Sequence, residues 1–192
     1  MRVLLACNIN PVLQRAVMDL GHYCLACDKK SPGHSLPFYQ GNVLDILNEG
    51  WDAMIGFPPC TYLSKAQVHL VNKSVERSYL AWEAAEFFIQ LFNSSIPRIV
   101  LENPPGLLNY FFRPPDQYIQ PWYFGDPYRK QIGLWLKNCP PVIASCYNTI
   151  RKPVSNRTNG RMSQAEKSKV RSDWSVFPNM CHQLAYQVLG KA

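Results

Sequence analysis

The sequence predicts a single α/β domain, residues 1–192, built on a mostly parallel, twisted sheet with helices on both faces. Short apolar runs alternate with segments of helical periodicity along the first half of the chain, the usual pattern of a parallel sheet with crossover helices. Apolar residues make up 47% of the chain, enough for a sizeable core, and charged residues make up only 17%, which argues against disorder. The length of 192 residues suits one domain.

Four strands and three helical segments are predicted in the first half. The strands are the apolar runs at 2–7, 22–28, 52–57 and 97–103. The helical segments are expected at 11–21, 42–50 and 75–95, with a loop over 31–38. Pro11 in the first turn and Gly21 at the end are the usual start and stop signals of a helix. The segment at 75–95 is the most regular, because its apolar residues recur at helical spacing.

The second half of the chain is less regular. One or two strands are expected within 118–145, and the clearest of them is 132–137. Residues 151–171 show no periodicity and are predicted to form a loop. A helix that begins after Pro178 is expected to follow.

Basic charge is concentrated in the predicted loop at 151–171. The net charge of the chain is +7, and this loop holds seven basic residues against one acidic residue, Glu166. Such a local excess favours contact with nucleic-acid phosphates, and a solvated loop without a partner is the alternative. The candidate nucleic-acid-binding residues are Arg151, Lys152, Arg157, Arg161, Lys167, Lys169 and Arg171.

The cysteine content and hydropathy predict a cytoplasmic protein with no membrane partner. Seven cysteines are an odd number in a chain too long for a disulfide-rich miniprotein, so reduced thiols are expected. No apolar run approaches the roughly 18 residues of a membrane span. The apolar stretch near the N-terminus is too short for a secretory signal.

Polar and proline-rich residues follow all four predicted strands of the first half. In open parallel sheets, ligands bind outside the carboxyl ends of the strands, so these residues are expected to meet at one site. They are Cys7 and Asn8, Cys27 and Asp28, Pro58 to Cys60, and Glu102 to Gly106. Such a site would contain a thiol, two carboxylates and amides.

These residue types suggest particular roles. Asp28 ends the second strand, where a carboxylate suits a ribose diol, although a helix N-cap or a loop position fits it equally well. Glu102, beside the thiol of Cys60, is a candidate proton donor or hydrogen-bonding group for a base. No glycine follows the first strand, which argues against a dinucleotide pyrophosphate site. Cys24 and Cys27 form a CxxC motif within a strand, which favours neither zinc nor thiol redox chemistry, and no metal site is expected.

The order of these motifs resembles DNA (cytosine-5) methyltransferases, and the whole chain is similar to short phage- and prophage-associated members of that group. The resemblance is carried by GFPPCTYLS at 56–64, ENPPG at 102–106, QPWYFGDPYRK at 120–130 and the helix between the first two. It implies a Rossmann-like class I methyltransferase fold, S-adenosylmethionine as cofactor, and methyl transfer to C5 of cytosine through a covalent cysteine adduct. The implied partner is DNA, single- or double-stranded, in a bacterial host cell.

The resemblance also implies roles for individual residues. Cys60 would be the nucleophile, Glu102 would contact N3 and the amino group of cytosine, and Arg129 would be the basic residue near the target base. Asp28 would hold the cofactor ribose and Asn42 would contact its adenine. Segment 177–188 resembles the last family motif, which completes the cofactor pocket. The implied cofactor-binding residues are Cys7, Asn8, Asp28, Asn42 and Pro58.

The chain departs from the family in two places. The turn CNIN at 7–10 lacks glycine, which is expected to narrow or close the cofactor pocket. Only about 45 residues separate Lys130 from the last motif, too few for a large target-recognition region, so limited sequence specificity is expected. Two alternatives remain: a catalytically reduced protein of this fold that binds nucleic acid or regulates phage–host conflict, and an enzyme acting on free or modified pyrimidine nucleotides.

Overall fold

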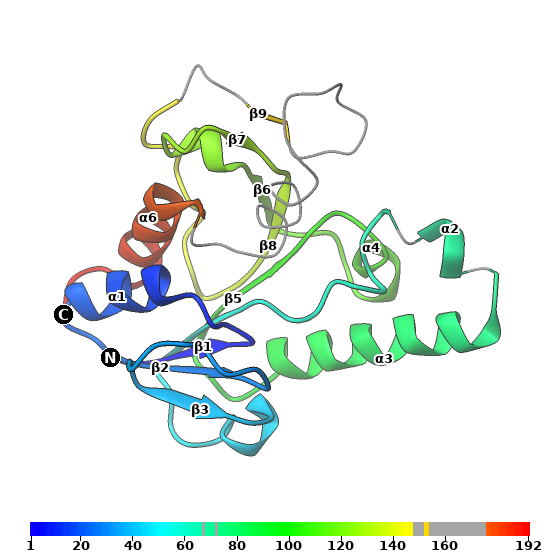
Figure 1. Cartoon of the computed structure of the whole chain (residues 1–192), viewed down its shortest axis with the longest axis horizontal. Helices are drawn as coiled ribbons and strands as arrows, with labels where there is room; N and C mark the ends of the chain where they lie inside the picture. The colour runs from blue at the N-terminus through cyan, green and yellow to red at the C-terminus, as the bar shows by residue number, and fades with distance from the viewer. Residues whose placement is uncertain (67, 72, 148–151, 154–175) are drawn as a thin grey trace.

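The computed structural model describes residues 1–66, 68–71, 73–147, 152–153 and 176–192. A seven-stranded sheet runs through the molecule in the order β3-β2-β1-β4-β5-β8-β6 (Figure 1). Its strands are β1 (Arg2–Ala6), β2 (Tyr23–Asp28), β3 (Phe38–Gln40), β4 (Ala53–Gly56), β5 (Arg98–Asn103), β6 (Gln117–Ile119) and β8 (Ile132–Lys137). The five strands β1 to β5 are parallel, and β8 lies antiparallel between β5 and β6. The predicted α/β fold with a mostly parallel sheet is confirmed.

Helices cover both faces of the sheet. The longer ones are α1 (Pro11–Asp19), α3 (Val75–Phe92) and α6 (Pro178–Leu189). The short ones are η1 (Val43–Asp45), α2 (Val68–Val71), α4 (Leu108–Phe111) and η2 (Pro121–Tyr123). None of the helices in the described part of the chain is long and apolar enough to span a membrane.

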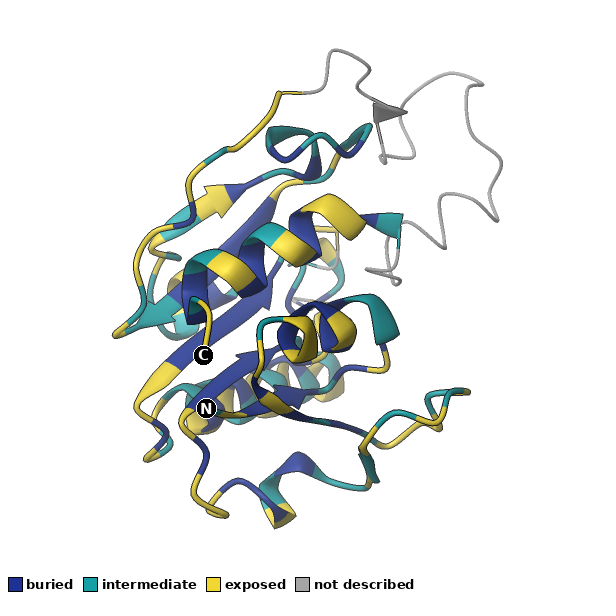
Figure 2. Ribbon diagram, turned by 90° about the vertical axis from the view of Figure 1, so that its left-hand side faces the viewer, coloured by how far each residue is buried: buried dark blue, intermediate teal, exposed yellow. Residues whose placement is uncertain are grey.

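The period-two pattern of the strands divides the core into two layers. Val3 and Leu5 of β1 pack in one cluster with residues of α1 and α6, whereas Leu4 and Ala6 pack in another with residues of α3. This follows from the alternation of side chains between the two faces of a strand. The central strands β1, β4, β5 and β8 are mostly buried, and the helices expose their outer sides (Figure 2). The two core layers fix the parallel strands, so that the carboxyl ends of these strands lie together along one edge of the sheet.

The structure corrects two local predictions. The loop predicted over 31–38 ends in strand β3, which begins at Phe38 and pairs in parallel with β2. Three residues are too few to show an alternating pattern, so the sequence did not reveal this strand. The helical turn predicted over 42–50 is confined to η1, whose N-terminus is capped by Asn42.

A second, two-stranded sheet pairs β7 (Tyr128–Arg129) in parallel with β9 (Lys152–Pro153). Asp126, just before β7, is buried, and its carboxylate accepts hydrogen bonds from the backbone N–H groups of Asn179 and Met180 at 3.3 and 2.9 Å. These N–H groups belong to the first turn of α6, where helices leave N–H groups unpaired. Residues 125–127, which precede β7, are therefore held against the N-terminus of α6.

The two proline-rich loops that follow β4 and β5 are joined to each other. The side-chain Nδ2 of Asn103 donates to the carbonyl of Pro58 at 3.0 Å, with both groups buried. The backbone of Lys65 donates to Pro105 and that of Leu107 donates to Leu63, each at 2.8 Å. The loop after β4 and the loop after β5 thus hold each other in place.

Gly106 allows this close approach, and its replacement by alanine is expected to loosen the joined loops. A Cβ atom at this position would lie 1.8 Å from the carbonyl oxygen of Leu63, a backbone atom that cannot rotate away. Gly106→Ala should lower the free energy of unfolding by about 1–3 kcal/mol or more, as overpacking usually does. Urea unfolding measures the change. Ser64→Ala, across the same bridge, is the control, and equal stability of Gly106→Ala and the parent protein would contradict the packing argument.

Candidate active site

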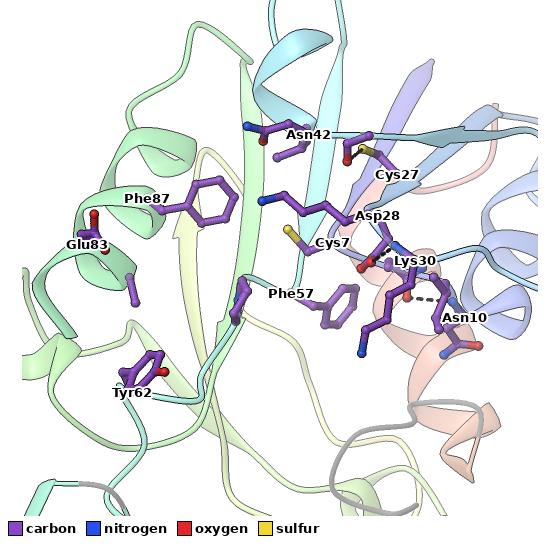
Figure 3. Close-up of a pocket in the computed structure, with 17 residues that line it drawn as sticks. Cys7, Asn10, Cys27, Asp28, Lys30, Asn42, Phe57, Tyr62, Glu83 and Phe87 are labelled. Atoms are coloured by element: carbon purple, nitrogen blue, oxygen red, sulfur yellow. Dashed lines mark hydrogen bonds between the residues drawn. The ribbon is translucent and has the colours of Figure 1, made fainter. Parts of the chain in front are cut away.

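A cavity of about 910 Å³ opens at the carboxyl ends of the parallel strands (Figure 3). Its walls come from the turn after β1, the end of β2, the segment between β3 and η1, the loop after β4, and helix α3. Four of the predicted cofactor-binding residues line it: Cys7, Asn8, Asp28 and Asn42. The fifth, Pro58, is a buried residue of the loop after β4 and does not line the cavity, whereas its neighbours Phe57 and Pro59 do.

The turn after β1 forms without glycine and leaves the cavity open. Cys7 adopts a φ of 55°, the left-handed conformation that glycine takes most easily. Asn8 Oδ1 accepts from the backbone of Asn10 at 3.0 Å, and Asn10 Oδ1 in turn accepts from Val12 at 2.9 Å and caps α1. Two asparagine side chains thus satisfy backbone groups that a glycine-rich turn would leave for a ligand. The turn was expected to narrow or close the pocket: closure is wrong, and narrowing stays a prediction.

Asp28 and Asn42 each hold a local turn and also face the cavity. Asp28 Oδ1 accepts from the backbone of Lys30 at 2.8 Å, and Asn42 Oδ1 accepts from that of Leu44 at 3.2 Å. Asp28 therefore occupies a loop turn and lines the cavity at the same time, so the two roles considered for it are compatible. Each side chain is held in place by its own turn.

Several cavity residues were not identified from the sequence. Phe87 and Glu83 of α3 lie on the side of the cavity away from Asp28, with Tyr62 and Phe57 below them in the view of Figure 3. Phe87 belongs to the apolar residues that recur at helical spacing in α3, and that spacing does not show that this part of the helix faces a cavity. Aromatic walls of this kind suit a planar, partly apolar ligand.

Cys60 lies next to Pro59 of the cavity wall and close enough to Glu102 for the carboxylate charge to act on its thiol. Cys60 is exposed, and its carbonyl accepts from the backbone of Leu63 and Ser64 at 3.1 and 3.0 Å, which forms a tight turn. Glu102, at the end of β5, is only 8% exposed, and its Oε1 has no hydrogen-bond partner among the described residues. Loss of solvent around its sulfur raises the pKa of Cys60, and the nearby charge of Glu102 raises it further.

Lys130 is the cation that acts on both of these groups. Its charge opposes the rise in the pKa of Cys60 and also opposes the burial that raises the pKa of Glu102. Its Nζ lies 5.7 Å from the centre of the Phe177 ring, just before α6. The predicted Arg129 is exposed in β7, and its role near a target base stays a prediction. The structure adds Lys130, the residue after Arg129, to the charged groups near Cys60 and Glu102.

The C-terminal helix α6 packs against the elements that carry the site. Asn10 Nδ2 donates to the sulfur of Cys181 in α6 at 3.7 Å, and α6 packs along α1. None of the described residues that line the cavity comes from α6. The segment resembling the last family motif thus holds the turn after β1 and the Lys130 segment.

The basic loop predicted for nucleic-acid contact lies almost wholly outside the described residues. Of the seven candidate basic residues, the backbone of Lys152 alone is described, in β9 beside β7. Its contact with nucleic acid therefore remains a prediction.

The other thiols near the site are poor nucleophiles. Burial raises the pKa of Cys7 and of Cys24 to about 12 and that of Cys27 to about 11. All seven cysteines are free, and the exposed ones are Cys60 and Cys146. Across the described ranges, no group of three or more histidine, cysteine or acidic residues could hold a metal ion.

Glu102→Gln is expected to stabilise the protein above acidic pH. Burial raises the pKa of Glu102 in the folded state above its ordinary value of 4.5, so the folded protein binds more protons than the unfolded chain. The free energy of unfolding must therefore fall as pH rises from about 4.5 through the raised pKa, by about 1.4 kcal/mol for each pH unit between the two values. The glutamine variant lacks this loss.

Urea unfolding of both proteins at pH 4.5 and pH 8 measures the difference. The variant should gain stability relative to the parent protein as pH rises. Glu86→Gln, an exposed acid of α3, is the control and should follow the parent. Parallel pH profiles for the parent and Glu102→Gln would show that Glu102 is not buried as described.

Comparison with solved structures places the fold in a known class. The chain is similar to a methyltransferase of Entamoeba histolytica, EhMeth, with a TM-score of 0.50 and 11% identity, over 86% of this chain and 62% of that chain. It is also similar to a prophage-encoded E. coli protein described as a DNA modification methyltransferase (TM-score 0.44, 14% identity, 70% of this chain and 45% of that chain) and to monomeric WbdD (TM-score 0.42, 13% identity, 89% of this chain and 43% of that chain). This chain thus spans less than two thirds of the length of each.

No family model matches the sequence, and no curated protein matches it. In the sheet order, β8 lies antiparallel between β5 and β6. This order and the likeness to EhMeth define a Rossmann-like methyltransferase fold. The predicted fold class is confirmed.

Proposed function

We propose that this protein transfers a methyl group from S-adenosylmethionine to C5 of cytosine in DNA, through a covalent adduct on Cys60 and with limited sequence specificity. One observation carries the proposal: an exposed cysteine residue and a buried carboxyl group lie together at the end of the sheet, beside a cavity of about 910 Å³. A binding protein would have no need of a buried acid next to an exposed thiol, because burial of an acid costs stability.

The cavity suits the cofactor. The Asp28 carboxylate can accept hydrogen bonds from a ribose diol, Asn42 can bond the edge of an adenine, and the rings of Phe57 and Phe87 provide apolar walls. Asn8 Nδ2 is buried and has no partner among the described residues, which leaves a donor for a ligand. When bound, S-adenosylmethionine supplies a methyl group on a positively charged sulfur, which is an electrophile that cytosine C5 can attack.

Cys60 would make cytosine reactive at C5. Its thiolate would form a bond to C6, and the electron pair of the C5–C6 double bond would become available at C5 for a new bond to the methyl carbon, whose bond to the cofactor sulfur would break with the electron pair left on that sulfur. The C5 proton then leaves to solvent, the sulfur–C6 bond breaks, and the thiolate is restored. Because only the thiolate adds, the charge of Lys130 helps by opposing the rise in the pKa of Cys60.

Glu102 would hold the base and supply a proton. Its raised pKa favours the protonated carboxyl group, which can donate to N3 of cytosine as the thiolate adds to C6. Transfer of that proton neutralises the negative charge that the addition would otherwise place on the ring, and N3 returns the proton to Glu102 after C5 has gained the methyl group. A cytosine within a duplex must first leave the stack, which costs a few kcal/mol.

DNA binding would come mainly from phosphate contacts. The basic segment 151–171 can supply affinity without base readout, which fits limited specificity. Affinity should therefore fall steeply with added salt.

Mass spectrometry of the reaction products tests the proposal. The protein is incubated with labelled S-adenosylmethionine and, separately, DNA, RNA or dCMP, and the nucleosides are then quantified. We expect labelled 5-methylcytosine in DNA. Label in dCMP but not in DNA would favour the nucleotide enzyme, and N4-methylcytosine would rule out the adduct chemistry. No label in any substrate would favour a binding protein.

A further inference from the structure

Three aromatic rings gather beside the strand that leads to Lys130, and we call them the aromatic cluster. Trp122 and Tyr123 belong to η2, and their ring centroids are 4.6 Å apart. The ring of Tyr147 lies 5.4 Å from that of Trp122 and 5.8 Å from that of Tyr123. Tyr147 keeps 64% of its surface exposed although it packs on both other rings. The cluster is therefore open to a ligand and is not part of the core.

The backbone helps to hold the aromatic cluster in shape. The N–H groups of Ser145 and Cys146 both donate to the carbonyl of Tyr123 at 3.1 Å, which brings the segment before Tyr147 onto η2. The indole N–H of Trp122 donates to an oxygen of the Gln120 side chain at 2.9 Å, which fixes the plane of the indole ring. The rings meet at angles of 50° to 76°, so no two of these three stack in parallel. Because the rings are already ordered, a flat ligand that stacks on them costs little side-chain entropy.

The segment that carries the aromatic cluster is the basic part of the sequence. Residues 117–171 contain ten of the 20 lysines and arginines but only two of the 13 acidic residues, Asp126 and Glu166. Asp126 is buried and bonded to the first turn of α6, so it is not at the surface. Arg129 is exposed in β7, which contacts η2. Aromatic rings together with positive charge favour a polyanion that carries flat groups, which is the chemistry of a nucleic acid.

Stacking on a side chain requires a base whose face is free. In a duplex each base is stacked on its neighbours and offers only its edge in the grooves. In a single strand the bases can separate from one another and lie on protein rings, with little dependence on their sequence. The aromatic cluster therefore favours an unpaired strand over a duplex. Stacking without sequence preference also agrees with the limited specificity of the proposed reaction.

We propose that the aromatic cluster binds unpaired bases of single-stranded DNA, and that this protein engages single strands in preference to duplex DNA. The choice of DNA as the polymer rests on the proposed function. Lys130 directly follows β7 and acts on both Cys60 and Glu102, so the cluster belongs to the same segment as the cation of the reacting groups. A cytosine in a single strand has no base pair to break before it reacts, which lowers the cost of reaching it.

Fluorescence anisotropy with labelled oligonucleotides of equal length tests the binding, with no cofactor present. The probes are single-stranded oligothymidylate, its RNA counterpart oligouridylate, a DNA duplex, and an abasic DNA strand that keeps the phosphates but lacks the bases. The parent protein should bind oligothymidylate about tenfold or more tightly than the abasic strand, as about one stacked base provides. It should also bind oligothymidylate more tightly than the duplex.

Substitution of Tyr147 locates the effect. Tyr147→Ala removes the most exposed ring of the cluster and should weaken binding of oligothymidylate about tenfold, while binding of the abasic strand stays within about twofold. Tyr147→Phe keeps the ring and should keep the parent affinity within about twofold. Tyr186→Ala, at an exposed tyrosine of α6 outside the cluster, is the matched control and should change neither. Urea unfolding checks that each variant is folded.

The outcomes separate this inference from the proposed function. Equal affinity for oligothymidylate and the abasic strand, or tighter binding of the duplex, would overturn the inference even if the protein methylates DNA. Equal losses for both DNA single strands in Tyr147→Ala would do the same. Tighter, Tyr147-dependent binding of oligouridylate would assign the cluster to RNA and overturn the choice of DNA. Binding as expected, without methylation of any substrate, would support the cluster as a DNA-binding site and overturn the proposed reaction.

Discussion

Cys60→Ser is expected to abolish methylation of cytosine, with a fall in rate of about a thousandfold or more. Addition to C6 requires an anionic nucleophile, and a serine hydroxyl is far less acidic than the thiol of Cys60, even with the pKa of that thiol raised by its surroundings. The substitution removes no hydrogen bond that holds the turn, because the turn is held by the backbone carbonyl of Cys60. The rate of label transfer from S-adenosylmethionine to DNA measures the effect.

Cys146→Ser is the matched control, because Cys146 is also exposed. Its rate should equal that of the parent protein. Binding of S-adenosylhomocysteine should be unchanged in both variants, which would show that each is folded. A Cys60→Ser variant that keeps a tenth or more of the parent rate would show that Cys60 is not the nucleophile.

Lys130→Met is expected to lower the rate about tenfold or more at neutral pH and to move the pH profile upward. The charge of Lys130 opposes the rise in the pKa of Cys60, so its loss lets that pKa rise further. For every pH unit by which the pKa of Cys60 rises, the thiolate fraction at any pH below it falls about tenfold. The same loss raises the pKa of Glu102, which keeps its proton to higher pH. The rate should therefore recover as pH is raised.

Arg129→Met provides the comparison, because it removes a neighbouring, exposed charge. We expect its pH profile to keep the parent midpoint. The measurement is the rate between pH 6 and pH 10 for the three proteins. A large fall in rate for Arg129→Met with no fall for Lys130→Met would contradict the role given to Lys130. It would indicate that Arg129 is the basic residue near the target base, as the family resemblance implies.

The sequence was sufficient to bring Cys60 and Glu102 together, and the reason is topological. Cys60 lies in the loop after β4 and Glu102 lies at the end of β5, and the carboxyl ends of parallel strands share one edge of the sheet. Their pairing therefore required only the strand assignments, which the apolar runs of β4 and β5 made clear. The covering helices α1 and α3 followed from their periodicity in the same way.

The choice between Arg129 and Lys130 could not be made from the sequence. Successive residues of an extended segment point to opposite sides, and a strand of two residues gives no pattern that would tell which side is inward. Phe87 and Glu83 were missed for a related reason. Helical periodicity shows which face of α3 is apolar, but not that part of the helix borders a cavity.

The joined loops after β4 and β5 were also invisible in the sequence. The bond from Asn103 to Pro58 and the close approach at Gly106 join residues about 45 positions apart. Such contacts depend on the register of two strands, which no local pattern contains.

Intact-mass measurement of a trapped complex tests the central claim most directly. The protein is incubated with S-adenosylmethionine and DNA that contains 5-fluorocytosine, whose C5 fluorine cannot leave as a proton does, so the thiolate stays bonded to C6. We expect one DNA strand joined to each protein molecule, with the bond mapped to Cys60 and absent in Cys60→Ser. DNA that is methylated at cytosine in the unsubstituted control but forms no such adduct, or an adduct that survives in Cys60→Ser, would contradict the account.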